Sequence, residues 1–236
     1  MTAAASRDVG SNFRMIKTLY FMSNLHLVNI ITHVTAGSIA LLLGIIALIS
    51  KKGGKIHRRA GKIFTALLVV IVLTALAGVF VFGRNTFLLV ITVLSAYYGF
   101  SGYRILLTKS NKPQFIDIFV AIVSLISVSY FLYYLKENGM YWSPVIIYST
   151  VGALTAIIAY DFIRYFIPKV KYGRLWLYEH IFKMIGAFTA LLAAFSGTVF
   201  PNYKPYSQFL PSVFGTVLQI AFIVYAYRQN NKTRLI

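Results

Sequence analysis

GKIHRRAGK, residues 54–62, is a short basic stretch between two long apolar ones, and this arrangement decides the fold. Four of its nine residues are cationic, and His57 lies in its middle. The apolar segments HVTAGSIALLLGIIALIS, residues 33–50, and KIFTALLVVIVLTALAGVFVF, residues 62–82, flank it. Each is close to the ~20 residues that a helix needs to cross a bilayer. A basic turn between two such segments is typical of a membrane helical hairpin.

The composition extends this interpretation to the whole chain. Of 236 residues, 58% are hydrophobic and 12% are charged, against about a quarter charged in a soluble domain. We therefore predict an all-α, polytopic membrane bundle of about seven transmembrane helices, because helices satisfy their backbone hydrogen bonds internally. The predicted spans are residues 27–50, 62–82, 86–106, 115–135, 144–166, 178–200 and 208–228.

The predicted domain organisation is one membrane domain with short ends. Residues 1–26 form an N-terminal tail that contains an interfacial helix or, alternatively, the start of a longer and tilted first span. Residues 27–228 form the seven-helix domain, and residues 229–236 form a basic tail. Cys is absent, which excludes disulfides, thiolate metal sites and cysteine catalysis.

The net charge of +18 predicts orientation and partners. Most lysines and arginines fall in alternate short segments, which places the N-terminus outside and the C-terminus in the cytosol of a bacterial inner membrane. The expected partners are the lipid bilayer and its anionic headgroups. Nucleic acid is not expected, because no folded basic surface outside the membrane is available to follow phosphates. The basic segments are 51–62, 104–112, 164–174 and 228–234.

Small residues predict where helices touch, because they let backbones approach closely in lipid. The packing positions singled out are Gly37 and Gly44 in the first span, Gly61 in the second and Gly186 in the sixth. These positions predict that the first, second and sixth spans form the interior. The fourth and seventh spans, rich in large apolar residues, are expected to face lipid.

Ionisable residues mark the candidate site. Asp161 and Glu179 fall near the cytosolic ends of their spans, at the same depth as His57, Arg58 and His180. Ionisable side chains at membrane depth are costly, so a ligand or cofactor site at this end is the leading hypothesis.

Structural explanations stand beside that hypothesis. Asp161 and Arg164 are three residues apart and could simply pair. Asp117 and Glu179 are placed in the first turns of their helices, where a carboxylate complements the helix dipole. His33 stands on the stripe of Gly37, where a histidine either hydrogen-bonds a neighbouring helix or serves as a ligand or proton relay.

Several chemistries remain open, and the sequence does not decide whether the protein is an enzyme. Haem b could be held between His57 and His180, or a divalent metal by His57, His180 and Asp161. Either would suit a redox role. The alternatives are an anionic ligand bound through Arg58, a proton-coupled transporter or sensor that uses His33 and His180, and a structural protein without catalysis.

Three motifs also resemble a known family. These are HVTAG at 33–37, KGGKIHRRAG at 52–61, and His180 with Met184 before an Ala-rich helix. Together they are similar to an uncharacterised bacterial integral membrane family, described as a predicted membrane protein with a domain of unknown function. The resemblance covers about a quarter of the chain. It implies no activity. It implies that the signature positions in this chain are His33, Gly37, His57, Arg58, Gly61, His180 and Met184.

Overall fold

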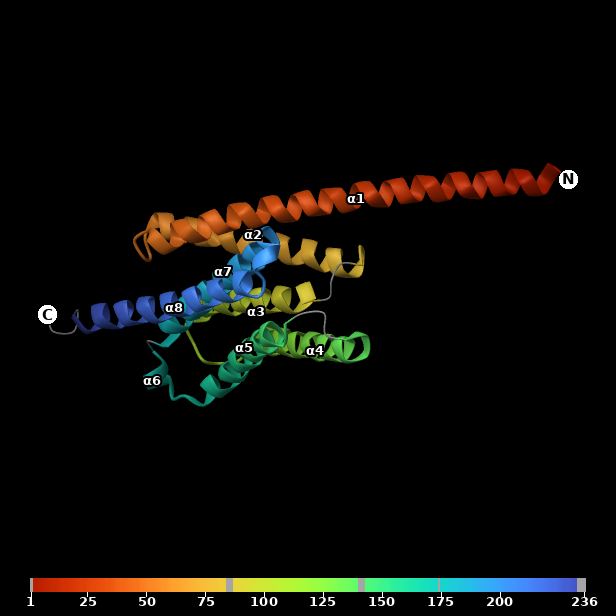
Figure 1. Cartoon of the computed structure of the whole chain (residues 1–236). Coiled ribbons are helices and arrows are strands. Elements are labelled where there is room, and N and C mark those ends of the chain that lie inside the picture. The colour runs from red at the N-terminus through yellow and green to blue at the C-terminus, as the bar shows by residue number, and fades with distance from the viewer. Residues whose placement is uncertain (1, 84–86, 140–142, 174, 233–236) are drawn as a thin grey trace.

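The computed structural model describes residues 2–83, 87–139, 143–173 and 175–232, and its regular elements are helices (Figure 1). The described elements are, in chain order, α1 (Thr2–Ile49), α2 (Lys55–Phe80), α3 (Phe87–Thr108), α4 (Phe115–Asn138), α5 (Pro144–Ile163), the 3-10 turn η1 (Arg164–Phe166), α6 (Lys169–Tyr172), α7 (Leu175–Val199), η2 (Pro201–Tyr203) and α8 (Tyr206–Lys232).

The predicted all-α bundle with seven spans is confirmed. Seven of the described helices are long and apolar enough to cross a membrane, namely α1 to α5, α7 and α8. Their bounds agree with the predicted spans within a few residues, except at the starts of α1 and α2. The protein is therefore a multi-pass helical membrane protein, with α6 as a short helix between two spans.

The first helix continues through the predicted boundary at residue 26. Helix α1 has 48 residues without a break, and its N-terminal part extends well beyond the end of α2 (Figure 1). At 1.5 Å per residue, 48 residues span about 70 Å, more than twice the ~30 Å hydrocarbon core. At the other end of the chain, residues 233–236 of the predicted basic tail lie outside the described residues.

The prediction that residues 54–62 form a loop is wrong, because most of this basic stretch is helix. The turn is short: Gly53 has a φ of +72°, and Gly54 is the N-cap of α2. His57, Arg58 and Lys62 belong to the first turns of that helix. Hydropathy assigned these residues to a loop because they are charged, but lysine and arginine are good helix formers.

The interior is built from the least hydrophobic spans. About 61% of the apolar stretch of α3 and 56% of that of α7 are buried, against 22% for α1 and for α2. The prediction of an interior location was thus right for the sixth span, α7, and wrong for the first and second spans, α1 and α2. It did not include the third span, α3, which is the most buried. The fourth and seventh predicted spans, α4 and α8, are only 22% and 11% buried.

Two of the four singled-out glycines lie against aromatic rings. A Cβ on Gly44 would overlap the ring of Phe188, and one on Gly186 would lie 3.0 Å from the ring of Tyr98. At Gly37 and Gly61 a Cβ would meet no atom within 4 Å. Close packing at Gly44 brings α1 onto α7, and close packing at Gly186 brings α7 onto α3. These contacts position the polar face of α7 described below.

Candidate functional site

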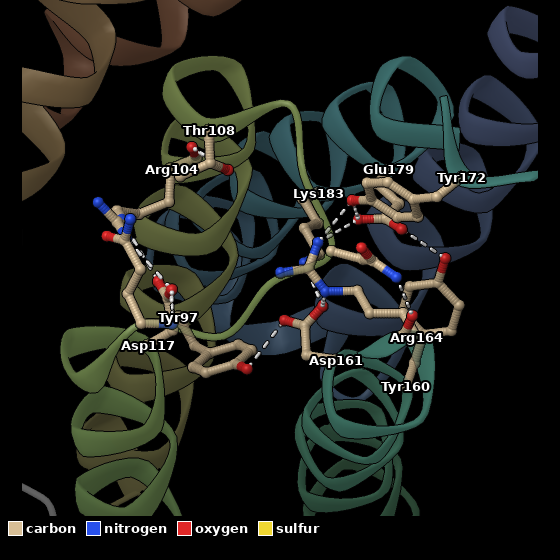
Figure 2. Close-up of polar contacts among 12 residues, drawn as sticks. Tyr97, Arg104, Thr108, Asp117, Tyr160, Asp161, Arg164, Tyr172, Glu179 and Lys183 are labelled. Atoms are coloured by element: carbon tan, nitrogen blue, oxygen red, sulfur yellow. Dashed lines mark hydrogen bonds and ion pairs between the residues drawn. The ribbon is translucent and has the colours of Figure 1, made fainter. Parts of the chain in front are cut away.

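Four charged side chains are buried together where α5 and α7 approach the same end of the bundle (Figure 2). Asp161 lies in the last turn of α5 and Arg164 in the turn that continues it, while Glu179 and Lys183 lie four residues apart on one face of α7. Their residues are 5%, 6%, 5% and 0% exposed. We call these four residues the charge network.

One half of the charge network centres on Asp161. Its Oδ1 accepts a hydrogen bond from Lys183 Nζ at 2.5 Å, and its Oδ2 accepts one from the Tyr97 hydroxyl of α3 at 2.9 Å. Arg164 Nε lies 3.2 Å from the same Oδ1, an ion pair whose N–H is not aligned for a hydrogen bond. Asp161 therefore connects α3, α5 and α7.

The other half centres on Glu179. Its Oε2 accepts hydrogen bonds from Arg164 at 2.7 Å and from the Tyr172 hydroxyl at 3.0 Å. Its Oε1 accepts one from the Tyr160 hydroxyl at 2.7 Å. Burial raises the pKa of the Tyr172 phenol, so that this residue remains a neutral donor.

The charges of this network balance. Two carboxylates face two cations, and each carboxylate oxygen accepts at least one hydrogen bond. Desolvation of a single unpaired charge costs several kcal/mol, so the four charges are tolerable inside the bundle only as a set. The predicted pairing of Asp161 with Arg164 is confirmed. The helix-dipole explanation of Glu179 is wrong, because α7 begins at Leu175 and has no acid in its first turn.

A second, smaller cluster lies beside the first and joins α3 to α4 (Figure 2). Arg104 Nε donates to Asp117 Oδ1 at 2.9 Å, and Arg104 also contacts Gln114. Asp117 accepts the Gln114 backbone N–H in a capping box at the start of α4. Here the explanation of Asp117 as a first-turn carboxylate is confirmed.

The two histidines at this end are held in matching ways. His57 Nδ1 lies 3.0 Å from the carbonyl oxygen of Ala47, and His180 Nδ1 lies 3.0 Å from that of Gly102. A carbonyl oxygen can only accept, so each ring carries its proton on Nδ1 and, when neutral, has a lone pair on Nε2.

The predicted haem or metal would bind through this pair. A histidine that binds a metal through one ring nitrogen commonly donates the N–H of the other nitrogen to a backbone carbonyl. Both rings here make such a hydrogen bond through Nδ1. However, the described residues contain no group of three or more His, Cys, Asp or Glu side chains that could hold a metal ion. Asp161, the third predicted metal ligand, instead bonds Lys183 and Tyr97. Gly186, one of the predicted packing positions, faces the ring of Tyr98.

The remaining candidates lie elsewhere. His33 Nδ1 lies 2.9 Å from the Thr74 hydroxyl, which itself donates to the Val70 carbonyl, so this ring joins α1 to α2. Arg58 is exposed at the start of α2. Neither residue contributes to the charge network.

The sequence interpretation located the two acids and the partner Arg164, but not the other partners. It did not single out Lys183, Tyr97, Tyr160 or Tyr172. A signal was available for Lys183, because it follows Glu179 by four residues, which places both on one helix face. No such signal exists for Tyr97, which is 64 residues from Asp161 in sequence.

Comparison with protein-family models, with curated proteins and with solved structures finds no match for this chain. The site must therefore be interpreted from its own chemistry.

Proposed function

We propose that this is a proton-responsive membrane protein, a transporter or a sensor, in which the charge network holds α5 against α7. The observation that carries the proposal is the pairing of Lys183, which has no exposed surface, with Asp161 on another span. Buried ionisable pairs within membrane bundles commonly belong to proton or ion pathways.

The hydrogen-bond pattern favours this function over the binding of a ligand by the two carboxylates. The carboxylates of Asp161 and Glu179 are engaged by protein donors. A ligand that needed them would first have to displace Tyr97, Lys183 or Arg164. A proton can bind to a carboxylate without displacing these side chains.

Protonation of Asp161 would change the charge balance directly. Lys183 would lose its counter-ion, and the set would carry one excess positive charge. Helix α5 packs on α3 and α4 and reaches α7 through these side chains. Loss of the Lys183 ion pair would weaken this link and leave the bonds of Tyr160 and Arg164 to Glu179. A two-state equilibrium biased in this way is the element that a proton-coupled carrier or sensor requires.

The test is a distance measurement between spin labels at two pH values. The chain has no native Cys, so Ile163→Cys on α5 and Phe195→Cys on α7 give one labelled pair. These positions are 62% and 42% exposed and lie outside the charge network. We expect the distance distribution to differ between the higher and the lower pH. Asp161→Asn at the higher pH should reproduce the low-pH distribution.

The matched control is Asp117→Asn, which removes a carboxylate from the neighbouring cluster. It should leave the pH response as in the parent protein. Identical distributions at both pH values, with Asp161→Asn also unchanged, would reduce the network to a structural role and refute the proposal.

A cofactor held by His57 and His180 is the second candidate, favoured by the Nδ1 hydrogen bonds to Ala47 and Gly102. Its test is an optical spectrum of the purified protein before and after dithionite, with metal analysis of the same sample. A Soret band that is lost in His180→Ala would support haem. A featureless spectrum without bound metal would reject this candidate.

The proposed setting is a bacterial inner membrane with the N-terminus outside and the basic ends of α1, α2 and α8 in the cytosol. It is supported by the concentration of lysine and arginine at those ends.

A further inference from the structure

A cleft lies between the end of α1 and the last turns of α8, away from the charge network. It has a volume of about 570 Å³. One wall comes from the end of α1 and the turn after it, and the other from α8. The lining residues are Leu48, Ile49, Ser50, Lys51, Lys52, Ala221, Phe222, Tyr225 and Gln229.

The lining is divided by chemistry along the direction of the helices. Leu48, Ile49, Ala221 and Phe222 are apolar and belong to the ends of two membrane spans. The polar side chains follow them in sequence on both walls, toward the helix ends. A molecule that fits both parts has an apolar body and a polar head at the level of the membrane surface.

The charge of the polar part is positive. Lys51 and Lys52 line the cleft, and its lining contains no acidic residue. Lys52 reaches across the cleft, because its Nζ bonds the carbonyls of Ala47 and Leu48 on α1 and lies 4.4 Å from the ring centroid of Phe222 on α8. Burial lowers the pKa of Lys52, so an anion beside it would favour the charged ammonium.

We infer that this cleft binds an anionic phospholipid, with the phosphate at Lys51 and Lys52 and an acyl chain along Ile49 and Phe222. Basic pockets at the cytoplasmic ends of membrane helices recognise lipid headgroups in this way. Ile49 is 79% exposed, an apolar surface that a lipid chain would cover.

The test is native mass spectrometry of the full chain in detergent, titrated with short-chain phosphatidylglycerol and, separately, with phosphatidylcholine of the same chains. We expect phosphatidylglycerol to bind more tightly. Lys51→Gln with Lys52→Gln should weaken its binding about tenfold and leave phosphatidylcholine unaffected. Ala221→Trp, which fills the apolar part, should also weaken it.

The matched control is Lys55→Gln with Lys62→Gln, which removes the same charge from exposed positions outside the cleft. This variant should bind phosphatidylglycerol like the parent protein. Equal loss in both double variants would indicate general surface attraction and overturn the inference. Free glycerol phosphate that competes as well as the lipid would overturn it too, since the site would then be a phosphate site.

Discussion

The charge network and the Arg104–Asp117 cluster use the same chemistry in two environments. Both pair a carboxylate with a cation from another helix. The side chains of Arg104 and Asp117 are 20% and 15% exposed, whereas that of Lys183 is fully buried and that of Asp161 is 7% exposed. When one residue of a partly solvated ion pair is removed, water can solvate the charge that remains, but water cannot reach a buried one. Removal of one partner should therefore cost far more stability in the charge network.

The largest expected effect is that of Lys183→Met. The substitution keeps an apolar chain of similar length, and it leaves Asp161 buried with one cationic neighbour fewer. We expect a loss of about 3 kcal/mol in the free energy of unfolding. Denaturant unfolding of the purified protein in mixed micelles measures it.

The double variant Asp161→Asn, Lys183→Met sharpens this comparison. It removes both charges, so it should recover most of the lost stability, because the penalty arises from an unpaired buried charge. If the double variant is as unstable as the sum of the two single variants, the two residues do not act as a pair.

A smaller effect is expected for Tyr97→Phe. This change removes the hydroxyl that donates to Asp161 Oδ2 and leaves both ions in place. A hydrogen bond to a buried carboxylate contributes about 2 kcal/mol. The same unfolding measurement should show that loss, and Tyr130→Phe, on an exposed tyrosine of α4, should show almost none.

The smallest effect is expected for Asp117→Asn. Arg104 remains partly solvated, and an asparagine can still accept the backbone N–H of Gln114. We expect a loss of about 1 kcal/mol or less, and added salt should reduce the difference from the parent protein. A loss as large as that of Lys183→Met would mean that exposure does not separate the two clusters.

Much of the fold followed from the sequence, because each span is a local signal. A run of apolar residues specifies a membrane helix whatever surrounds it. Asp161 and Glu179 stood out for the same reason, as rare acids at membrane depth. Their partners depend on which helices meet, and that information is distributed over the whole chain. Tyr97 could therefore be recognised as a partner of Asp161 only in the folded bundle, whereas Lys183 carried a local signal in its four-residue spacing from Glu179.

The error over the interior has a more general cause. Helix α3 has the lowest mean hydropathy of the seven spans, 1.2, and is the most buried, whereas α2 has the highest, 2.8, and is only 22% buried. In water the most apolar helix would be buried. In a bilayer the apolar surface is already solvated by lipid, and polar side chains such as Tyr97 and Ser95 gain from being inside.

This inverse order bears on how the chain enters the membrane during synthesis. The spans that form the interior, α3 and α7, are the two that hydrocarbon accepts least readily on their own. Helix α3 follows the strongly apolar α2 and precedes α4, so its neighbours can retain it at the translocon. Helix α7 carries Glu179 and Lys183, and it is synthesised after α5 and the η1 turn have supplied Asp161 and Arg164. The order of the sequence thus provides the counter-ions before the helix that needs them.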